Sequence, residues 1–255
     1  AMTLSGVLFN GVSIGSRGTN YTLDAACRGA WFMNGTVGET DRSSYGENLG
    51  AQSGTIDRST DVPPGYSGYS RDFEAGDTED LYIGADGSDV DIYGADQAIT
   101  VACWIKSETT DYTTSVHLVG KNYTSGNQRQ YRIGINSMEV AEFRLSSDGT
   151  ANTAAVGVTN VCDGSWHHIV GVYDDTDIRL YVDGDLDANE ANNPITYTAG
   201  IFNSTAYFYV GGYDASLFLF DGLMDEVIVF NRALSATEVA EMYQYGISGN
   251  KGGSD

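Results

Sequence analysis

The sequence predicts an all-β protein, a sandwich of two antiparallel sheets with one short helix near the C-terminus. The 255 residues include 32 Gly, 17 Tyr and only 3 Pro, a composition that suits short strands joined by turns. Apolar residues fall in short alternating runs, as expected for half-buried strands. Only the stretch after Ser235 changes to helical spacing, so one helix is expected.

Length and charge narrow the class of protein further. A chain of 255 residues fits one large domain that buries roughly three quarters of its unfolded surface. The formal net charge of −22 repels nucleic acid and anionic membranes. No apolar stretch reaches the length that spans a bilayer. We therefore expect no nucleic-acid partner and no membrane insertion, and the carboxylates form either a solvated acidic surface or a dedicated acidic site.

The apolar runs place the strands in order along the chain, and turn residues separate them. Pro63 to Gly65 and Asp148 with Gly149 are turn signals. Asp183 with Gly184 predicts a tight hairpin of the primed type. The expected strands are residues 70–73, 80–83, 99–106, 118–121, 131–135, 143–145, 155–158, 166–173, 178–182, 207–212 and 223–230.

The closing segment joins a buried strand to the helix. Residues 223–230 are mostly apolar and β-branched, but Asp225 lies among them, and a buried carboxylate needs hydrogen-bonding partners or a metal. Ser235 and Glu238 form the S-x-x-E pattern of a capping box. The helix is expected to run to about Gly246, a natural residue for its C-terminal cap.

Three stretches resemble the LamG-like jelly rolls (laminin G type 3, concanavalin A-like). They are ITVACWIK at 99–106, DGSWHHIVGVYD at 163–174, and GLMDEV followed by NRALS within 222–235. The resemblance covers residues 26–246, which leaves 1–25 as an extension or linker and 247–255 as a flexible tail. It implies a jelly-roll β-sandwich, typically a non-catalytic module of a larger extracellular, cell-surface or virion-surface protein.

The resemblance also implies a structural calcium ion. In related jelly rolls an N-terminal loop and the Asp of the last strand share this ion, which takes six to eight oxygen ligands. The alternative is that Asp225 only accepts backbone hydrogen bonds. The ligands implied for this chain are Asp225, Asp41, Asn34 and Asn48.

The leading functional hypothesis is a non-catalytic, lectin-like module that binds a glycan or polysaccharide. Sugars are held by aromatic faces and hydrogen-bonding side chains. Arg132, like Lys121, either pairs with a carboxylate or reaches an acidic group of the ligand. The candidate contacts on expected strand ends and loops are Asp111, Tyr112, Tyr123, Arg132 and Tyr213.

Other functions stay open. A structural or adhesion domain, such as part of a phage fibre, would bind protein surfaces instead of sugar. A glycoside hydrolase or lyase needs a carboxylate pair, and the nearest group, at Glu74, Asp77 and Glu79, does not keep the period of a strand face, so no catalysis is expected. The three cysteines allow one disulfide and a free thiol, or three buried thiols.

Overall fold

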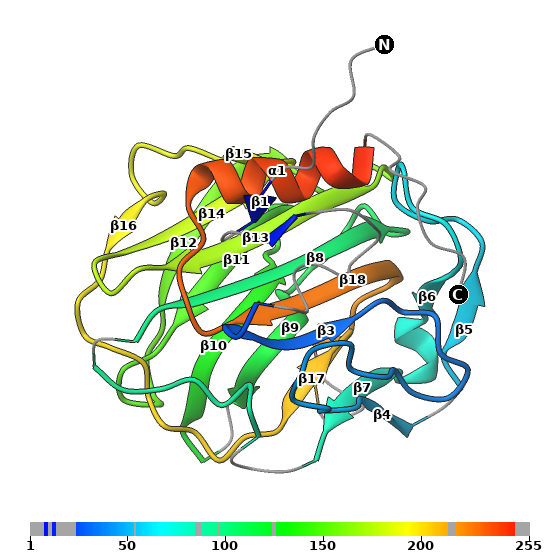
Figure 1. Ribbon diagram of the computed structural model, residues 1–255, viewed down its shortest axis with the longest axis horizontal. Helices are drawn as coiled ribbons and strands as arrows, with labels where there is room; N and C mark the ends of the chain where they lie inside the picture. Colours follow the sequence, from blue (N-terminus) through cyan, green and yellow to red (C-terminus); the bar gives the residue numbers. More distant parts are fainter. Residues whose placement is uncertain are drawn as a thin grey trace.

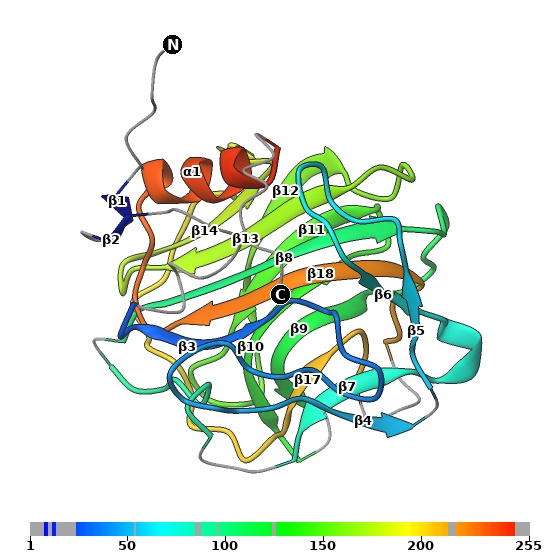
Figure 2. The ribbon, with the colours of Figure 1, turned by 45° about the vertical axis from the view of Figure 1, so that its right-hand side comes forward.

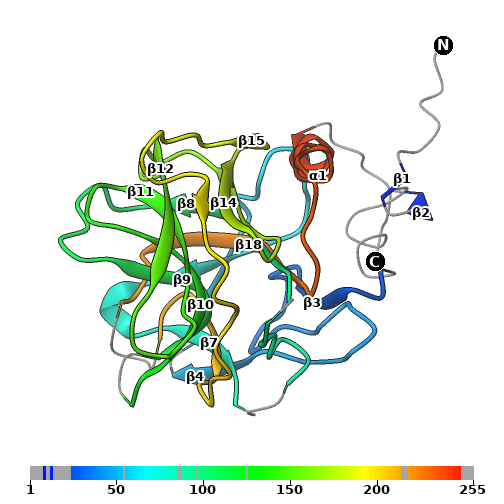
Figure 3. The same cartoon turned by 90° about the vertical axis from the view of Figure 1, so that its left-hand side faces the viewer.

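A computed structural model describes residues 24–53, 55–84, 88–95, 97–123, 126–213 and 218–247, together with strand residues 8–9 and 12–13. Two antiparallel sheets lie face to face, and helix α1 (Ala236–Ile247) packs on the outer side of one of them (Figures 1 and 3). The expected all-β sandwich with a C-terminal helix is thus confirmed. Within the described residues, no helix is both long and apolar enough to cross a membrane.

The larger sheet runs in the order β15-β14-β13-β8-β18-β6-β5, with β16 paired to β14 and β3 to β18. The closing strand β18 lies between β8 on one side and β3 and β6 on the other (Figure 2). The strands are β3 (Cys27–Trp31), β5 (Asp57–Ser59), β6 (Ser70–Phe73), β8 (Ile99–Ser107), β13 (His167–Tyr173), β14 (Asp177–Val182), β15 (Asp185–Leu186), β16 (Ile195–Thr196) and β18 (Gly222–Phe230).

The seven-stranded sheet runs in the order β12-β11-β10-β9-β17-β7-β4. A separate pair, β1 (Leu8–Phe9) and β2 (Val12–Ser13), lies outside both sheets, and a 3-10 turn covers Ala75–Asp77. The strands of the seven-stranded sheet are β4 (Gly50–Ser53), β7 (Asp80–Ile83), β9 (Val116–Tyr123), β10 (Gln128–Ile135), β11 (Val140–Leu145), β12 (Thr153–Asn160) and β17 (Phe208–Val210).

The main core fills the space between the two sheets. Successive side chains of a strand point to opposite faces, so one set of each strand is buried here, including Phe143, Phe208 and Tyr131. The alternate set, including Arg132, Glu142 and Arg144 of β10 and β11, is left for the outer face. The outer face of the seven-stranded sheet therefore carries polar and aromatic side chains.

Helix α1 covers the outer face of the nine-stranded sheet. Its apolar side joins a second buried cluster with residues of β8, β13 and β18, and Tyr243 stacks on Trp104 at 5.6 Å between ring centroids. The capping box forms as expected, because Ser235 Oγ accepts the Glu238 N–H at 3.2 Å and Glu238 accepts the Ser235 N–H at 2.8 Å. Because α1 packs on this face, we expect a ligand site on the outer face of the seven-stranded sheet.

Two further expectations are decided by local structure. Asp183 and Gly184 both have positive φ, 53° and 87°, which confirms the primed hairpin turn. The three cysteines, Cys27, Cys103 and Cys162, are all buried and free, so the alternative of three buried thiols holds in this structure.

Candidate ligand-binding site

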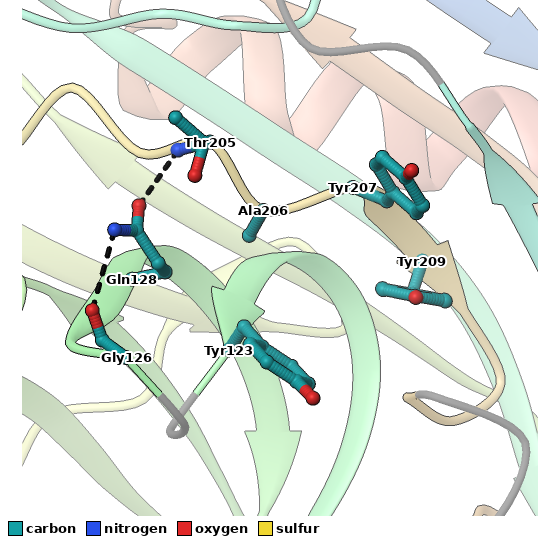
Figure 4. A pocket seen from close by; sticks show the side chains of 7 residues that line it. All are labelled: Tyr123, Gly126, Gln128, Thr205, Ala206, Tyr207 and Tyr209. Atoms are coloured by element: carbon teal, nitrogen blue, oxygen red, sulfur yellow. Dashed lines mark hydrogen bonds between the residues drawn. The ribbon is translucent and has the colours of Figure 1, made fainter.

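A cleft of about 380 Å³ opens on the outer side of the seven-stranded sheet, beside β17 and the β9–β10 hairpin (Figure 4). Three tyrosines form its apolar walls: Tyr123 from the end of β9, and Tyr207 and Tyr209 from β17 and the residue before it. We call it the tyrosine cleft. It is completed by Gly126, Gln128, Thr205 and Ala206.

The strand pattern explains why these tyrosines face outward. Phe208 belongs to the core between the sheets, so its neighbours Tyr207 and Tyr209 take the opposite face. Tyr82 of β7 pairs with Tyr209 in register and stacks near it, at 6.2 Å between ring centroids. Tyr207 keeps 42% of its surface exposed, which makes it the most accessible aromatic ring of the cleft.

Hydrogen bonds hold the polar rim of the cleft in place. Gln128 accepts the Thr205 N–H at 2.7 Å and donates to the Gly126 carbonyl at 3.3 Å (Figure 4). Ser204 donates to the Gln128 carbonyl at 2.7 Å. The segment before β17 is thereby tied to the hairpin, so binding a ligand there would not need to order either one.

The structure places the five expected contacts in different environments. Tyr123 lines the tyrosine cleft, and Arg132 lines a second cleft beside it. Asp111 is exposed but lines neither cleft. The other two candidates, Tyr112 and Tyr213, are buried and line neither cleft, which argues against direct contact with a ligand.

Both buried tyrosines have structural partners. The Tyr112 hydroxyl lies 3.2 Å from the Asp221 carbonyl and 3.3 Å from Ser107 Oγ, and burial raises the pKa of Tyr112 to about 12. The Tyr213 ring stacks on Phe218 at 5.5 Å and meets Tyr123 edge-on at 5.0 Å. Tyr213 thus supports the cleft wall from behind.

The residues expected to hold calcium are occupied by hydrogen bonds. Asp41 accepts the N–H groups of Ala30, Ser43 and Glu47 at 2.8 to 2.9 Å and the Ser43 hydroxyl at 2.6 Å. Asn48 Oδ1 in turn accepts the Asp41 N–H at 2.9 Å. Asp41 organises its own loop through these contacts, as short acidic side chains commonly do in turns.

The other two expected ligands are similarly engaged. Asn34 Oδ1 accepts the Tyr69 N–H at 2.8 Å, and Asp225 Oδ1 accepts the Glu226 N–H at 2.8 Å. Calcium takes six to eight oxygen ligands, water among them. The four hydrogen bonds to Asp41 take all four lone-pair sites of its carboxylate, which argues against Asp41 as a ligand. The alternative of Asp225 as a backbone acceptor agrees with the contact seen, and calcium binding itself stays a prediction for measurement in solution.

The buried guanidinium of Arg71 supplies a positive charge near the loop that contains Asn34 and Asp41. Arg71 of β6 is 0% exposed and donates to Glu39 at 2.5 Å, to the Ile56 carbonyl at 2.6 Å and to the Gly38 carbonyl at 3.3 Å. Glu39 also accepts the Gly35 N–H at 2.9 Å. One carboxylate and two backbone carbonyls therefore surround the guanidinium of Arg71.

The acidic residues considered for catalysis, Glu74, Asp77 and Glu79, lie in the connection from β6 to β7, which joins the two sheets. Glu79 is buried and accepts the Glu74 N–H at 2.9 Å. Carboxylate oxygens of Asp72, Glu74 and Glu108 lie within 4.8 Å of one another. Burial, and after it the neighbouring carboxylates, raises the pKa of each of these three. Among the residues that the structure describes, no Asp, Glu or His lines the tyrosine cleft.

Comparison with known proteins decides the family. A family model for the concanavalin A-like lectin/glucanases superfamily (Laminin_G_3) matches residues 77–240, more than half of the chain. The chain belongs to this superfamily. Among curated proteins, none matches the sequence. The resemblance inferred from the strand motifs is therefore confirmed.

Solved structures share the concanavalin A-like fold. The binding domain of botulinum neurotoxin DC, in complex with rat synaptotagmin II, has a TM-score of 0.63 at 12% identity, over 86% of this chain and 51% of that one. The binding domain of Paraclostridial Mosquitocidal Protein 1 gives 0.62 at 13%, over 86% and 52%. This chain thus spans about half the length of those toxin domains.

A third structure is covered almost completely. Domain 4 of AbnA, a GH43 extracellular arabinanase from Geobacillus stearothermophilus, was solved in complex with arabinotriose. It matches with a TM-score of 0.59 at 16% identity, over 86% of this chain and 98% of that one. At such identities the likeness shows the fold alone.

Proposed function

We propose that the chain is a non-catalytic carbohydrate-binding module and that its sugar site is the tyrosine cleft. The observation that carries the proposal is the wall of three tyrosines, joined by the amide of Gln128 and by Thr205 around about 380 Å³. Sugars present C–H faces that pack on aromatic rings and hydroxyls that need hydrogen bonds. This cleft offers both kinds of contact.

The lining also argues against catalysis there. Glycoside hydrolysis needs carboxyl groups on either side of the scissile bond, and the described part of the lining contains no Asp, Glu or His. A binding role also agrees with two proteins of similar fold. Domain 4 of AbnA was solved in complex with arabinotriose, and the binding domain of botulinum neurotoxin DC was solved in complex with SialylT.

The test is a panel of neutral and acidic glycans and polysaccharides, probed with calcium and with chelator. We expect specific binding that chelator leaves unchanged. A blank panel would contradict the proposal and favour an adhesion or structural domain that binds protein surfaces. Glycan binding would also support our proposal that the module works outside the cell or on a cell or virion surface, within a larger protein.

A further inference from the structure

A second cleft, of about 410 Å³, adjoins the tyrosine cleft on the same sheet. Three of the chain's 13 lysines and arginines line it, although the chain has 35 Asp and Glu. We call it the arginine cleft. Its lining residues are Ser115, Asn122, Arg129, Arg132, Arg144, Thr150, Asn152 and Phe218.

The positive charge in the arginine cleft is only partly balanced. Arg132 and Arg144 both donate to the buried carboxylate of Glu142, at 2.5 and 2.6 Å, and Arg129 donates to the Thr150 carbonyl. Two guanidinium groups thus share one carboxylate, and Arg129 adds a third positive charge beside them. Burial, and after it the charges of Arg144 and Arg129, lowers the pKa of Arg132 although Glu142 opposes this.

Two buried donors in the arginine cleft lack acceptors. Arg132 and Arg144 Nε are buried without a hydrogen-bond partner in the described part of the chain, and the Arg132 side chain is only 7% exposed. Arg132 and Arg144 also face each other in register on β10 and β11, and like charges directly opposite destabilise a sheet. Proteins keep such unfavourable pairs mainly at functional sites. We therefore expect a bound ligand to compensate the repulsion between Arg132 and Arg144.

The two clefts are close enough for one ligand to reach both. Gln128 pairs with Tyr123 in register, and the next pair is Arg129 with Asn122. The first pair lines the tyrosine cleft and the second lines the arginine cleft. Adjacent residues of a strand point to opposite faces, but Tyr209, Gly120, Arg132 and Arg144 pair in register across β17, β9, β10 and β11. Tyr209 and the two arginines therefore lie on one face of the sheet.

We propose that the glycan is acidic and that the arginine cleft binds its anionic group, a carboxylate or a sulfate ester. Guanidinium groups bind such oxyanions through paired hydrogen bonds, and Asn122 and Asn152 add amide donors beside them. The Debye length at physiological ionic strength is about 8 Å, so a bound anion responds mainly to these arginines and not to distant carboxylates. The inference rests on sugar binding in the neighbouring tyrosine cleft.

The test compares matched polymers. Polygalacturonate is measured against its methyl-esterified form, and dextran sulfate against dextran. We expect at least one charged polymer to bind about tenfold more tightly than its neutral partner, as expected for hydrogen bonds to a charged group. The pair that shows the preference tells carboxylate from sulfate.

Arg144→Gln should abolish the preference, and Arg179→Gln is the control. Both side chains are about equally exposed, 29% and 26%, and both pair with carboxylates, but Arg179 lies on β14 of the other sheet. Circular dichroism and melting temperature establish that both variants fold. Equal binding of charged and neutral polymers, or equal loss in both variants, overturns the anion proposal alone. Lack of binding to all four polymers overturns sugar binding as well.

Discussion

Replacing Arg71 by Met should strongly destabilise the domain. The guanidinium is fully buried and holds Glu39, whose side chain is 3% exposed, together with the carbonyls of Ile56 and Gly38. Met fills most of the volume but leaves the Glu39 charge without its partner. Breaking one side of a buried ion pair costs about 3–5 kcal/mol.

The expected loss of stability converts to a large shift in melting temperature. At roughly 2–4 °C per kcal/mol for a domain of this size, Tm should fall by roughly 10 °C in calorimetry. Arg179→Met is the control, because its partially exposed pairs with Asp174 and Asp177 are worth about 0–1 kcal/mol. Adding Glu39→Gln to Arg71→Met should recover part of the loss, since no buried charge remains. A drop for Arg71→Met no larger than that of the control would refute this reasoning.

Further predictions concern pH, packing, capping and metal. Burial lowers the pKa of His167, but the carboxylates of Asp183 and Asp163 outweigh it and the net pKa is raised. The stabilisation is thus fully present below about pH 6.5 and is lost as pH rises through the folded pKa, so the Tm of wild type should fall more between pH 6 and 8 than that of His167→Gln. Tyr213→Ala should cost about 3–5 kcal/mol of unfolding free energy, seen in urea denaturation, whereas an unchanged midpoint would restore it as a surface contact. Ser235→Ala should cost about 1 kcal/mol in the same assay, and no change would mean that the cap is not formed in solution. The structural calcium ion implied by the family resemblance predicts that chelator lowers Tm and that added calcium restores it, and an unchanged Tm would contradict it.

Much of the fold could be predicted because its signals are local. The alternation of apolar residues marked the strands, Asp183 with Gly184 marked a hairpin, and Ser235 with Glu238 marked the start of the helix. The order of strands in each sheet was not predicted, because no local pattern fixes which strands pair.

The site was predicted less well because its tyrosines look alike in sequence. Tyr112 and Tyr213 were expected on the surface, yet only 8% and 1% of their surface is exposed. The alternation around Phe208 does carry a signal for Tyr207 and Tyr209, since both must face away from a buried Phe. Arg71 gave no signal, because its partner Glu39 lies 32 residues earlier and only the folded sheets bring the two together.

The most direct test of sugar binding in the tyrosine cleft is a calorimetric titration of the best panel ligand into wild type, Tyr207→Ala and Tyr93→Ala. Tyr207 and Tyr93 are similarly exposed, 42% and 45%, but Tyr93 does not line the cleft. Losing one aromatic contact should weaken binding about five- to tenfold. We therefore expect Tyr207→Ala to lose affinity by that factor and Tyr93→Ala to bind like wild type. Equal affinity of all three proteins would contradict the account.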